Sequence, residues 1–235
     1  MALYTASALA FTPLASQDRL AIKQAWQTIG PDSCPHVYNF HMHTTSSDGK
    51  LQPEQVMEQA VQIGLKGMAI TDHHTVRGYY GAQDWLNRMI CSDHPLTLPH
   101  LWTGIEITAQ LLGTDVHILG YAFDPTDPRL NPYLQGSAPT GEMAEAGRVI
   151  GAIQQAGGLV VLAHPERYRL SGDQLIPAAV ELGIDGVETY YAYRSTNPWQ
   201  PTPDTTERVK GLSDRYGLFN TCGTDTHGTN LLLRI

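Results

Sequence analysis

The sequence predicts an α/β fold in which seven parallel strands alternate with helices and close into a barrel related to the TIM barrel. Two observations predict this class. Short apolar runs that suit buried strands alternate with amphipathic segments along residues 37–222. A His, Asp or Glu lies at or close to the end of each run, and in such barrels the chemical groups lie at the carboxyl ends of the strands. An open, doubly wound sheet is the alternative arrangement of the same elements.

The expected elements are short, and glycines end several of the helices. We expect strands at residues 37–41, 67–71, 100–107, 115–122, 159–163, 184–189 and 218–222. We expect helices at residues 53–63, 77–90, 142–156, 172–182 and 204–216, with loops at 124–140 and 194–203. Residues 1–35 are predicted to form a helical appendage, with a short helix that is capped near Asp18 and runs through Trp26. Residues 36–235 are predicted to form the main domain.

Composition restricts the class of protein. The 235 residues are 42% hydrophobic and carry a net charge of −8, which favours a globular domain and argues against unassisted binding to duplex nucleic acid. No apolar run has the length of a membrane span, and the N-terminus lacks the basic region of a signal peptide. Cys34, Cys91 and Cys222 form no CxxC pair, so we expect free thiols and a cytoplasmic location.

A histidine pair follows the first expected strand. Residues i and i+2 of a strand point to the same face, so His41 and His43 can reach one point together, and a loop that curls back brings Asp48 nearby. Imidazole and carboxylate groups without a thiolate are typical of a divalent metal site. The HxH pattern alone is equally typical of two surface histidines, so the choice depends on whether the later strands supply further ligands.

The later strands add metal-compatible residues at the same register, and their joint placement favours a metal site. These residues are Asp72, His73, His74, Glu106, His117, His164, Glu188, Asp225 and His227. Glu188 is either a carboxylate that orients a ligand histidine or simply the polar end of a strand. Asp72 either contacts an imidazole or caps the next helix. His36, His94 and His100 lie outside the pattern and are expected to be structural, as is His74, which is also a candidate substrate contact because it adjoins His73.

Six stretches of this chain together resemble a known family. They are His41-Met42-His43 with Ser47-Asp48-Gly49, Ile70-Thr71-Asp72-His73, Gly104-Ile105-Glu106-Ile107, Val116-His117-Ile118-Leu119-Gly120, Leu162-Ala163-His164-Pro165 and Gly223-Thr224-Asp225-Thr226-His227. The chain resembles the PHP (polymerase and histidinol phosphatase) phosphoesterases over about residues 37–228. The resemblance implies a distorted (β/α)7 TIM-like barrel with a trinuclear metal centre.

Carried over by position, the resemblance implies nine ligands for two to three divalent ions of Mn, Fe or Zn. The first ion would be held by His41, His43, Glu106 and Asp225. The second would be held by His117, His164 and a bridging Glu106, and the third by Asp48, His73 and His227. On this basis Asp48 is expected to serve the third ion and not to share one with His41 and His43.

The implied activity is hydrolysis of a phosphomonoester, a 3′,5′-bisphosphate or an oligonucleotide by a hydroxide that bridges the metals. Glu106, Asp225 and His227 are the expected catalytic residues. The stretch His164-Pro165-x-Arg167-Tyr168 resembles the branch of nucleoside-3′,5′-bisphosphate phosphatases and 5′-3′ exoribonucleases. We therefore expect a small phosphorylated substrate, with Arg167, Arg194 and His74 as candidate contacts.

Three alternatives stay open. A histidinol-phosphate-type phosphatase would share the ligand set. A metal-dependent amidohydrolase also begins with HxH but needs a different later set. A PHP module without activity would have lost ligands, and none is missing here. The chain also departs from the bisphosphatase branch, because only residues 122–142 separate the fourth expected strand from the next helix. We therefore expect a more open substrate pocket.

Overall fold

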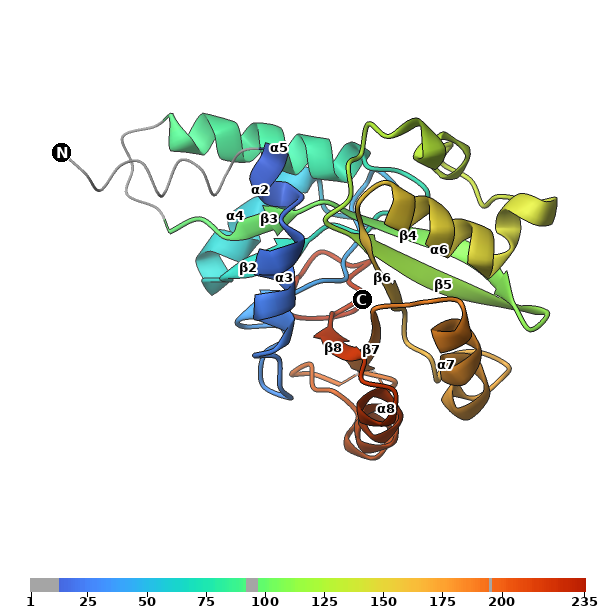
Figure 1. Ribbon diagram of the computed structural model, residues 1–235. Helices are drawn as coiled ribbons and strands as arrows, with labels where there is room; N and C mark the ends of the chain where they lie inside the picture. Colours follow the sequence, from blue (N-terminus) through green and yellow to red (C-terminus); the bar gives the residue numbers. More distant parts are fainter. Residues whose placement is uncertain (1–12, 92–96, 195) are drawn as a thin grey trace.

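The computed structural model describes residues 13–91, 97–194 and 196–235 (Figure 1). The strands are β1 (Tyr38–Asn39), β2 (Gly67–Ala69), β3 (His100–Trp102), β4 (Gly104–Leu111), β5 (Thr114–Tyr121), β6 (Leu159–Leu162), β7 (Gly186–Tyr190) and β8 (Phe219–Cys222). The α-helices are α2 (Pro13–Ser16), α3 (Arg19–Trp26), α4 (Pro53–Ile63), α5 (Arg77–Ile90), α6 (Ala146–Gln155), α7 (Gly172–Glu181) and α8 (Pro203–Arg215). Two 3-10 helices precede α6: η1 (Pro128–Tyr133) lies in the expected loop at 124–140, and η2 (Gly141–Ala144) lies where the helix at 142–156 was expected to begin.

The strands form two sheets, which confirms the mixed α/β class. The first sheet has the parallel order β1-β2-β3, and the second has the order β4-β5-β6-β7-β8. In the described residues the two sheets do not close into the seven-stranded barrel that we expected. The strands of the second sheet are also not all parallel, because β5 runs antiparallel to both β4 and β6.

Two local features explain the difference. The expected third strand is split at Thr103, whose N–H donates to Ser16 O and whose Oγ1 donates to Phe123 O, so β3 and β4 belong to different sheets. Strand β4 then turns back into β5 through Leu112 and Gly113, with φ angles of 52° and 68°. Two residues in this left-handed region form the tight hairpin turn that suits twisted antiparallel strands, and a helical crossover is absent there.

Backbone contacts join the two sheets at one end. Met42 pairs with Thr226 just beyond β1 and β8, and His73 pairs with Glu106 between the end of β2 and β4. The Asp225 N–H donates to His41 O at 2.8 Å. The segments that carry the predicted ligands are therefore held together at the carboxyl ends of β1, β2 and β8, where such folds place their chemistry.

Helices cover the outer faces of both sheets. Figure 1 shows α4 and α5 beside the three-stranded sheet, and α6, α7 and α8 around the outside of the five-stranded sheet. The expected helix through Trp26 is present as α3, and Asp18 accepts hydrogen bonds from the backbone N–H groups of Leu20 and Ala21. Trp26 is buried against Tyr121 and Phe219, at the end of the strands away from the predicted ligands.

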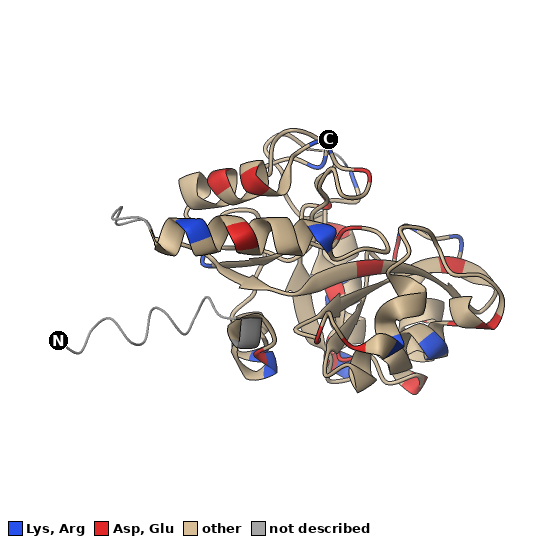
Figure 2. Cartoon of the chain, turned by 90° about the horizontal axis from the view of Figure 1, so that it is seen from above, with Lys and Arg blue, Asp and Glu red and all other residues tan. Residues whose placement is uncertain are grey.

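The surface carries mixed charge. Figure 2 shows Lys and Arg positions scattered between Asp and Glu positions. Within the described part of the chain, no helix combines the length and the apolar character that crossing a bilayer requires.

Candidate metal centre

The backbone turns sharply where three of the predicted residues leave their strands. His164 has a φ of 23°, Asp225 of 52° and His74 of 54°, all in the left-handed region that non-glycine residues rarely adopt. Such strained positions cluster at functional sites because the surrounding structure must hold them. His41 follows β1 by two residues and is absent from the positive-φ positions of the described chain, so it leaves its strand without such a turn.

Glu106 is the centre of the site. Its carboxylate is 1% exposed, and Oε2 lies 3.0 Å from His41 Nε2 and 3.1 Å from His43 Nε2. On the other side, Oε1 lies 2.7 Å from His117 Nδ1 and 3.4 Å from His164 Nε2. One buried carboxylate thus lies between two pairs of imidazoles, which is the position that the bridging role implied by the resemblance needs.

Asp225 completes the first predicted set. Its Oδ1 lies 3.2 Å from His43 Nε2 and 3.5 Å from His41 Nε2. Ligand atoms of His41, His43, Glu106 and Asp225 all lie within 4.8 Å of one another, and all four residues are buried. This is the compact arrangement that a single divalent ion requires.

Asp48 faces a second cluster at the rim. Its Oδ2 lies 3.3 Å from His227 Nε2 and 3.9 Å from His73 Nε2, so the loop reaches across to the two residues that the sequence predicted. The same carboxylate also lies 3.7 Å from His43 Nδ1. His43 therefore lies beside Asp48 as well as beside Glu106, because its two ring nitrogens face different clusters, and the expectation that Asp48 serves the third ion stays a prediction.

The loop that carries Asp48 is held by Asp72, whose role the sequence left between two alternatives. Asp72 Oδ1 accepts from Thr44 N and Ser47 Oγ, and Oδ2 accepts from Thr44 Oγ1, each at 2.7 Å. No imidazole is among these partners. Asp72 therefore fixes the loop between His43 and Asp48, and its neighbour His73 faces the same cluster.

Glu188 contacts two predicted metal ligands, His41 and His164. Its Oε1 lies 3.0 Å from His41 Nδ1, and its Oε2 accepts a hydrogen bond from the backbone N–H of His164 at 2.9 Å. Because the opposite nitrogen of His41 faces Glu106, Glu188 orients the ring toward the centre of the site. Glu188 and the two histidines are also close enough to form a metal-compatible group of their own.

Charge around the cluster shifts the pKa values of its members. Burial alone would lower the pKa of His41, but Glu106, Glu188 and Asp225 raise it well above the ordinary value. Burial likewise opposes charge on His43, yet the nearby carboxylates of Asp225 and Glu106 raise its pKa to about 9. Burial would raise the pKa of Glu106 and Asp225, but the histidines hold both well below the usual range. Burial lowers the pKa of His73 to about 4.

The donor set fits divalent cations. Buried ligand-type atoms without a hydrogen-bond partner include both ring nitrogens of His43, Nδ1 of His117 and Oε1 of Glu106. Such atoms are costly when buried unless something satisfies them, and a cation between imidazoles and carboxylates does so. The mixed nitrogen and oxygen donors suit Mn²⁺, Fe²⁺ or Zn²⁺.

Loading the metal-free protein with Zn²⁺ or Mn²⁺ at pH 7.5 is expected to release about one to two protons. His41 and His43 are protonated at that pH because their pKa values are raised, and an imidazole must lose its proton before it can bind a metal. His73 is already neutral and releases none. Metal affinity is therefore expected to rise from pH 7 to about pH 9. Calorimetric titrations in buffers of different ionisation enthalpy measure the release, and a buffer-independent binding enthalpy would contradict it.

The structure treats the three predicted substrate contacts differently. Arg167 is in the site, where Nη1 donates to Asp225 Oδ2 at 2.8 Å. His74 is buried next to His73, with Nε2 3.2 Å from Thr108 Oγ1. Arg194 pairs with Asp204 on the exposed surface, and among the described residues no ion pair or side-chain hydrogen bond joins it to the cluster. Its expected contact with substrate therefore has no support from this geometry.

The remaining histidines behave as expected where they are described. His100 is partly buried, stacks on Trp102 and lies with Nε2 3.0 Å from Ala15 O. His36 is exposed. His94 lies outside the described residues.

Two residues that contact the predicted metal ligand Asp225 were not identified from the sequence. Arg234 Nε donates to Asp225 Oδ2 at 2.9 Å, and Tyr191 Oη donates to the same oxygen at 2.7 Å. Neither lies in a recognised stretch, and an arginine seven residues after His227 carries no sequence signal.

The PHP domain model matches residues 39–168. The chain belongs to the PHP domain family. That stretch is more than half of the chain and contains seven of the nine predicted ligands, all except Asp225 and His227.

Three similar proteins indicate the range of this PHP domain protein's relatives. The chain is 31% identical to the 5′-3′ exoribonuclease Rnm of Escherichia coli over 145 residues, which cover 56% of this chain and 47% of that protein. It is 25% identical to a phosphoribosyl 1,2-cyclic phosphate 1,2-diphosphodiesterase of Eggerthella lenta over 268 positions, which cover 82% and 94% of the two chains. A crystal structure from Bifidobacterium adolescentis, assigned as a metal-dependent phosphoesterase, is 25% identical, covers 83% and 89% and has a TM-score of 0.66.

The coverage of these relatives limits what they show. The chain spans about half the length of the exoribonucleases that it matches. The alignment with the cyclic phosphodiesterase has more positions than this chain has residues, so that relative contains segments that this chain lacks.

Proposed function

We propose that this PHP domain protein hydrolyses phosphoesters at a centre of two to three divalent ions. The observation that carries the proposal is the buried Glu106 carboxylate between the imidazoles of His41, His43, His117 and His164, with Asp225 completing the set. Bound divalent cations would neutralise phosphate oxygens and lower the pKa of water. The relatives that are phosphodiesterases and exoribonucleases by name support the same class of reaction.

The chain's own residues would divide the work as follows. His41, His43, Glu106 and Asp225 would hold one ion, Glu106, His117 and His164 a second, and Asp48, His73 and His227 a third. Arg167 lies at the open side of Asp225 with a side chain that is 38% exposed, so its free nitrogens can donate to a phosphate. His74 faces the same rim. Phosphoryl transfer depends mainly on positioning and electrostatics, and this rim provides both.

We infer that the substrate is small and phosphorylated, with nucleotides and short oligonucleotides as the first candidates because of the exoribonuclease relatives. The net charge of −8 and the mixing of Lys and Arg with Asp and Glu positions in Figure 2 do not favour duplex nucleic acid as the substrate. A five-membered-ring cyclic phosphodiester is the second candidate, because the relative with that activity aligns with 82% of this chain. We retain the expected cytoplasmic location because Cys34, Cys91 and Cys222 are free thiols.

The test is a substrate panel with the purified protein loaded separately with Mn²⁺, Fe²⁺ and Zn²⁺. The panel contains a nucleoside 3′,5′-bisphosphate, short RNA, a cyclic sugar phosphate, histidinol phosphate and p-nitrophenyl phosphate, with amide and carboxyl ester substrates as the rival class. We expect hydrolysis only with metal and only of phosphoesters, measured as released phosphate for the monoesters and as separated nucleotide or opened-ring products for the RNA and the cyclic sugar phosphate. Hydrolysis of the amide in preference to every phosphoester would contradict the proposal and favour an amidohydrolase. A metal-loaded protein that hydrolyses nothing would favour a module without activity.

A further inference from the structure

The two oxygens of Asp225 have different surroundings. Oδ1 faces the imidazoles of His41 and His43, at 3.5 Å and 3.2 Å. Oδ2 faces away from them and accepts three hydrogen bonds, from Tyr191 Oη at 2.7 Å, Arg167 Nη1 at 2.8 Å and Arg234 Nε at 2.9 Å. Because three donors occupy Oδ2, only Oδ1 is free to bind a cation between the histidines.

Arg234 and its neighbour also hold the backbone of the same turn. The carbonyl of Arg234 accepts from His227 N at 2.7 Å, and the carbonyl of Leu233 accepts from Thr226 Oγ1 at 2.8 Å. Arg234 therefore touches Asp225 through its side chain and His227 through its backbone. These two residues belong to different clusters, so one residue fixes the relative positions of both.

The strain in this turn makes such support necessary. Asp225 has a φ of 52°, and its backbone N–H donates to His41 O at 2.8 Å. A residue held in the left-handed region keeps that conformation only when surrounding contacts fix it. Arg234 supplies a charge-assisted hydrogen bond, which is stronger than a neutral one.

We propose that Arg234 is a positioning residue that reserves Oδ1 of Asp225 for the metal. Tyr191 acts with it, since its hydroxyl bonds to both Oδ2 and Arg234 Nε. The inference rests on the proposed metal role of Asp225 and adds to it a residue that acts on metal affinity without touching the ion.

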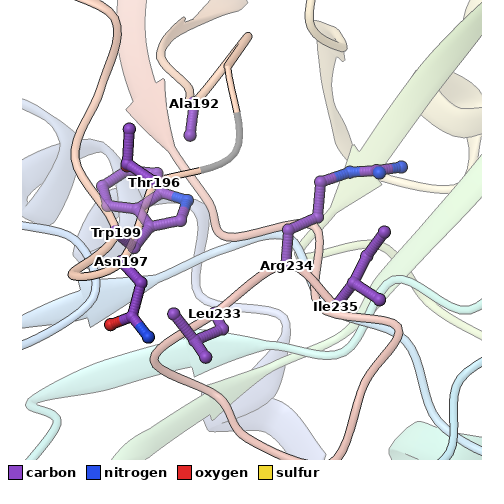
Figure 3. A pocket seen from close by; sticks show the side chains of 7 residues that line it. All are labelled: Ala192, Thr196, Asn197, Trp199, Leu233, Arg234 and Ile235. Atoms are coloured by element: carbon purple, nitrogen blue, oxygen red, sulfur yellow. The ribbon is translucent and has the colours of Figure 1, made fainter.

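Arg234 also borders a pocket. None of the predicted metal ligands lines that pocket. The pocket has a volume of about 230 Å³, and its lining includes Ala192, Trp199, Leu233 and Arg234. Figure 3 shows the guanidinium of Arg234 pointing away from Trp199. Its Nε is engaged by Asp225 and Tyr191, so the side chain serves the metal site and only its stem lines the pocket.

The test is the metal affinity of Arg234→Met in the whole chain, measured for Zn²⁺ and Mn²⁺ by competition with a chromogenic chelator. Removing an outer hydrogen bond to a metal ligand typically costs about 10- to 100-fold in affinity, and we expect that loss for one class of ion. The number of ions bound at saturation should stay as in the wild type. The metal concentration for half-maximal activity should rise by the same factor, and excess metal should restore kcat, which a general structural defect would not allow.

Three further variants make the result decisive. Arg234→Lys keeps one charged donor and should recover part of the affinity, and Tyr191→Phe should weaken the same class of ion with little risk to the fold. Arg129→Met is the matched control and should bind metal as the wild type does, because Arg129 pairs with Asp127 on the exposed surface. If Arg234→Met does not fold, Arg234→Lys and Tyr191→Phe carry the test.

Wild-type affinity in Arg234→Met, with a large loss in Asp225→Asn, would overturn the role of Arg234 and leave Asp225 as a ligand. Wild-type affinity in Asp225→Asn would overturn both. A protein that binds metal as expected but cleaves no phosphoester would overturn the proposed function alone, because the role of Arg234 is measured by binding.

Discussion

Replacing Glu106 with Gln is expected to lower phosphoester hydrolysis by at least about 1,000-fold in the metal-loaded protein. Among the residues that the structure describes, only the Glu106 carboxylate faces both pairs of imidazoles, and Gln keeps its shape but removes its charge. Metal centres stabilise the transition state of phosphoester cleavage by several kcal/mol, and about 4 kcal/mol corresponds to 1,000-fold. Metal content by mass spectrometry should fall at the same time, while circular dichroism keeps its wild-type form.

Glu188→Gln is the matched comparison for Glu106→Gln. Glu188 is equally buried and contacts His41, but from the side opposite the centre of the site. Because it orients a ligand and does not bridge two sets, its replacement should cost only about 10- to 100-fold. Equal losses of activity in the two variants would mean that Glu106 contributes no more to hydrolysis than Glu188 does. Wild-type turnover in Glu106→Gln would contradict the proposed metal site.

Replacing Gly223 with Ala is expected to destabilise the protein by about 1–3 kcal/mol, the usual cost of overpacking a buried site. A Cβ at this position would lie 2.2 Å from His41 Cβ and 2.8 Å from His41 N, so backbone and not only a flexible side chain must move. The same atom would lie 2.9 Å from Glu188 Oε1. For a chain of this length the melting temperature should fall by about 2–4 °C per kcal/mol, and metal affinity should fall because His41 is displaced.

Gly211→Ala is the control for that prediction. Gly211 lies in α8, and a Cβ there would meet nothing within 4 Å. An alanine in a helix interior is more favourable than a glycine by about 0.5–1 kcal/mol, so this variant should melt slightly higher than the wild type. Thermal unfolding of both variants under one set of conditions measures the contrast, and a Gly223→Ala protein as stable as the wild type would show that His41 can move freely.

The periodic part of the fold was predictable from the sequence. The helix over Pro53–Ile63 has the bounds that its apolar spacing and Gly64 predict, and the helix over Arg77–Ile90 likewise follows its pattern. The antiparallel turn of β4 into β5 was missed, because Leu112 and Gly113 do not form one of the usual hairpin dipeptides. The break at Thr103 depends on a hydrogen bond to Ser16, which is 87 residues away in the chain, and no local pattern records such a contact.

For the site, the sequence by itself determined which residues are metal-compatible and predicted that they meet at the carboxyl ends of the strands. That register holds for the residues that follow β1, β2, β6 and β8, whereas Glu106 and His117 lie inside β4 and β5. Spacing and residue type carry that information, because a strand fixes on which face His41 and His43 stand. Only the tertiary structure decided which atoms face one another. In the structure Glu106 lies between two pairs of imidazoles, the two nitrogens of His43 face different clusters, and Arg234 donates to Asp225. The sequence could not predict these contacts because they depend on how separate strands and turns pack.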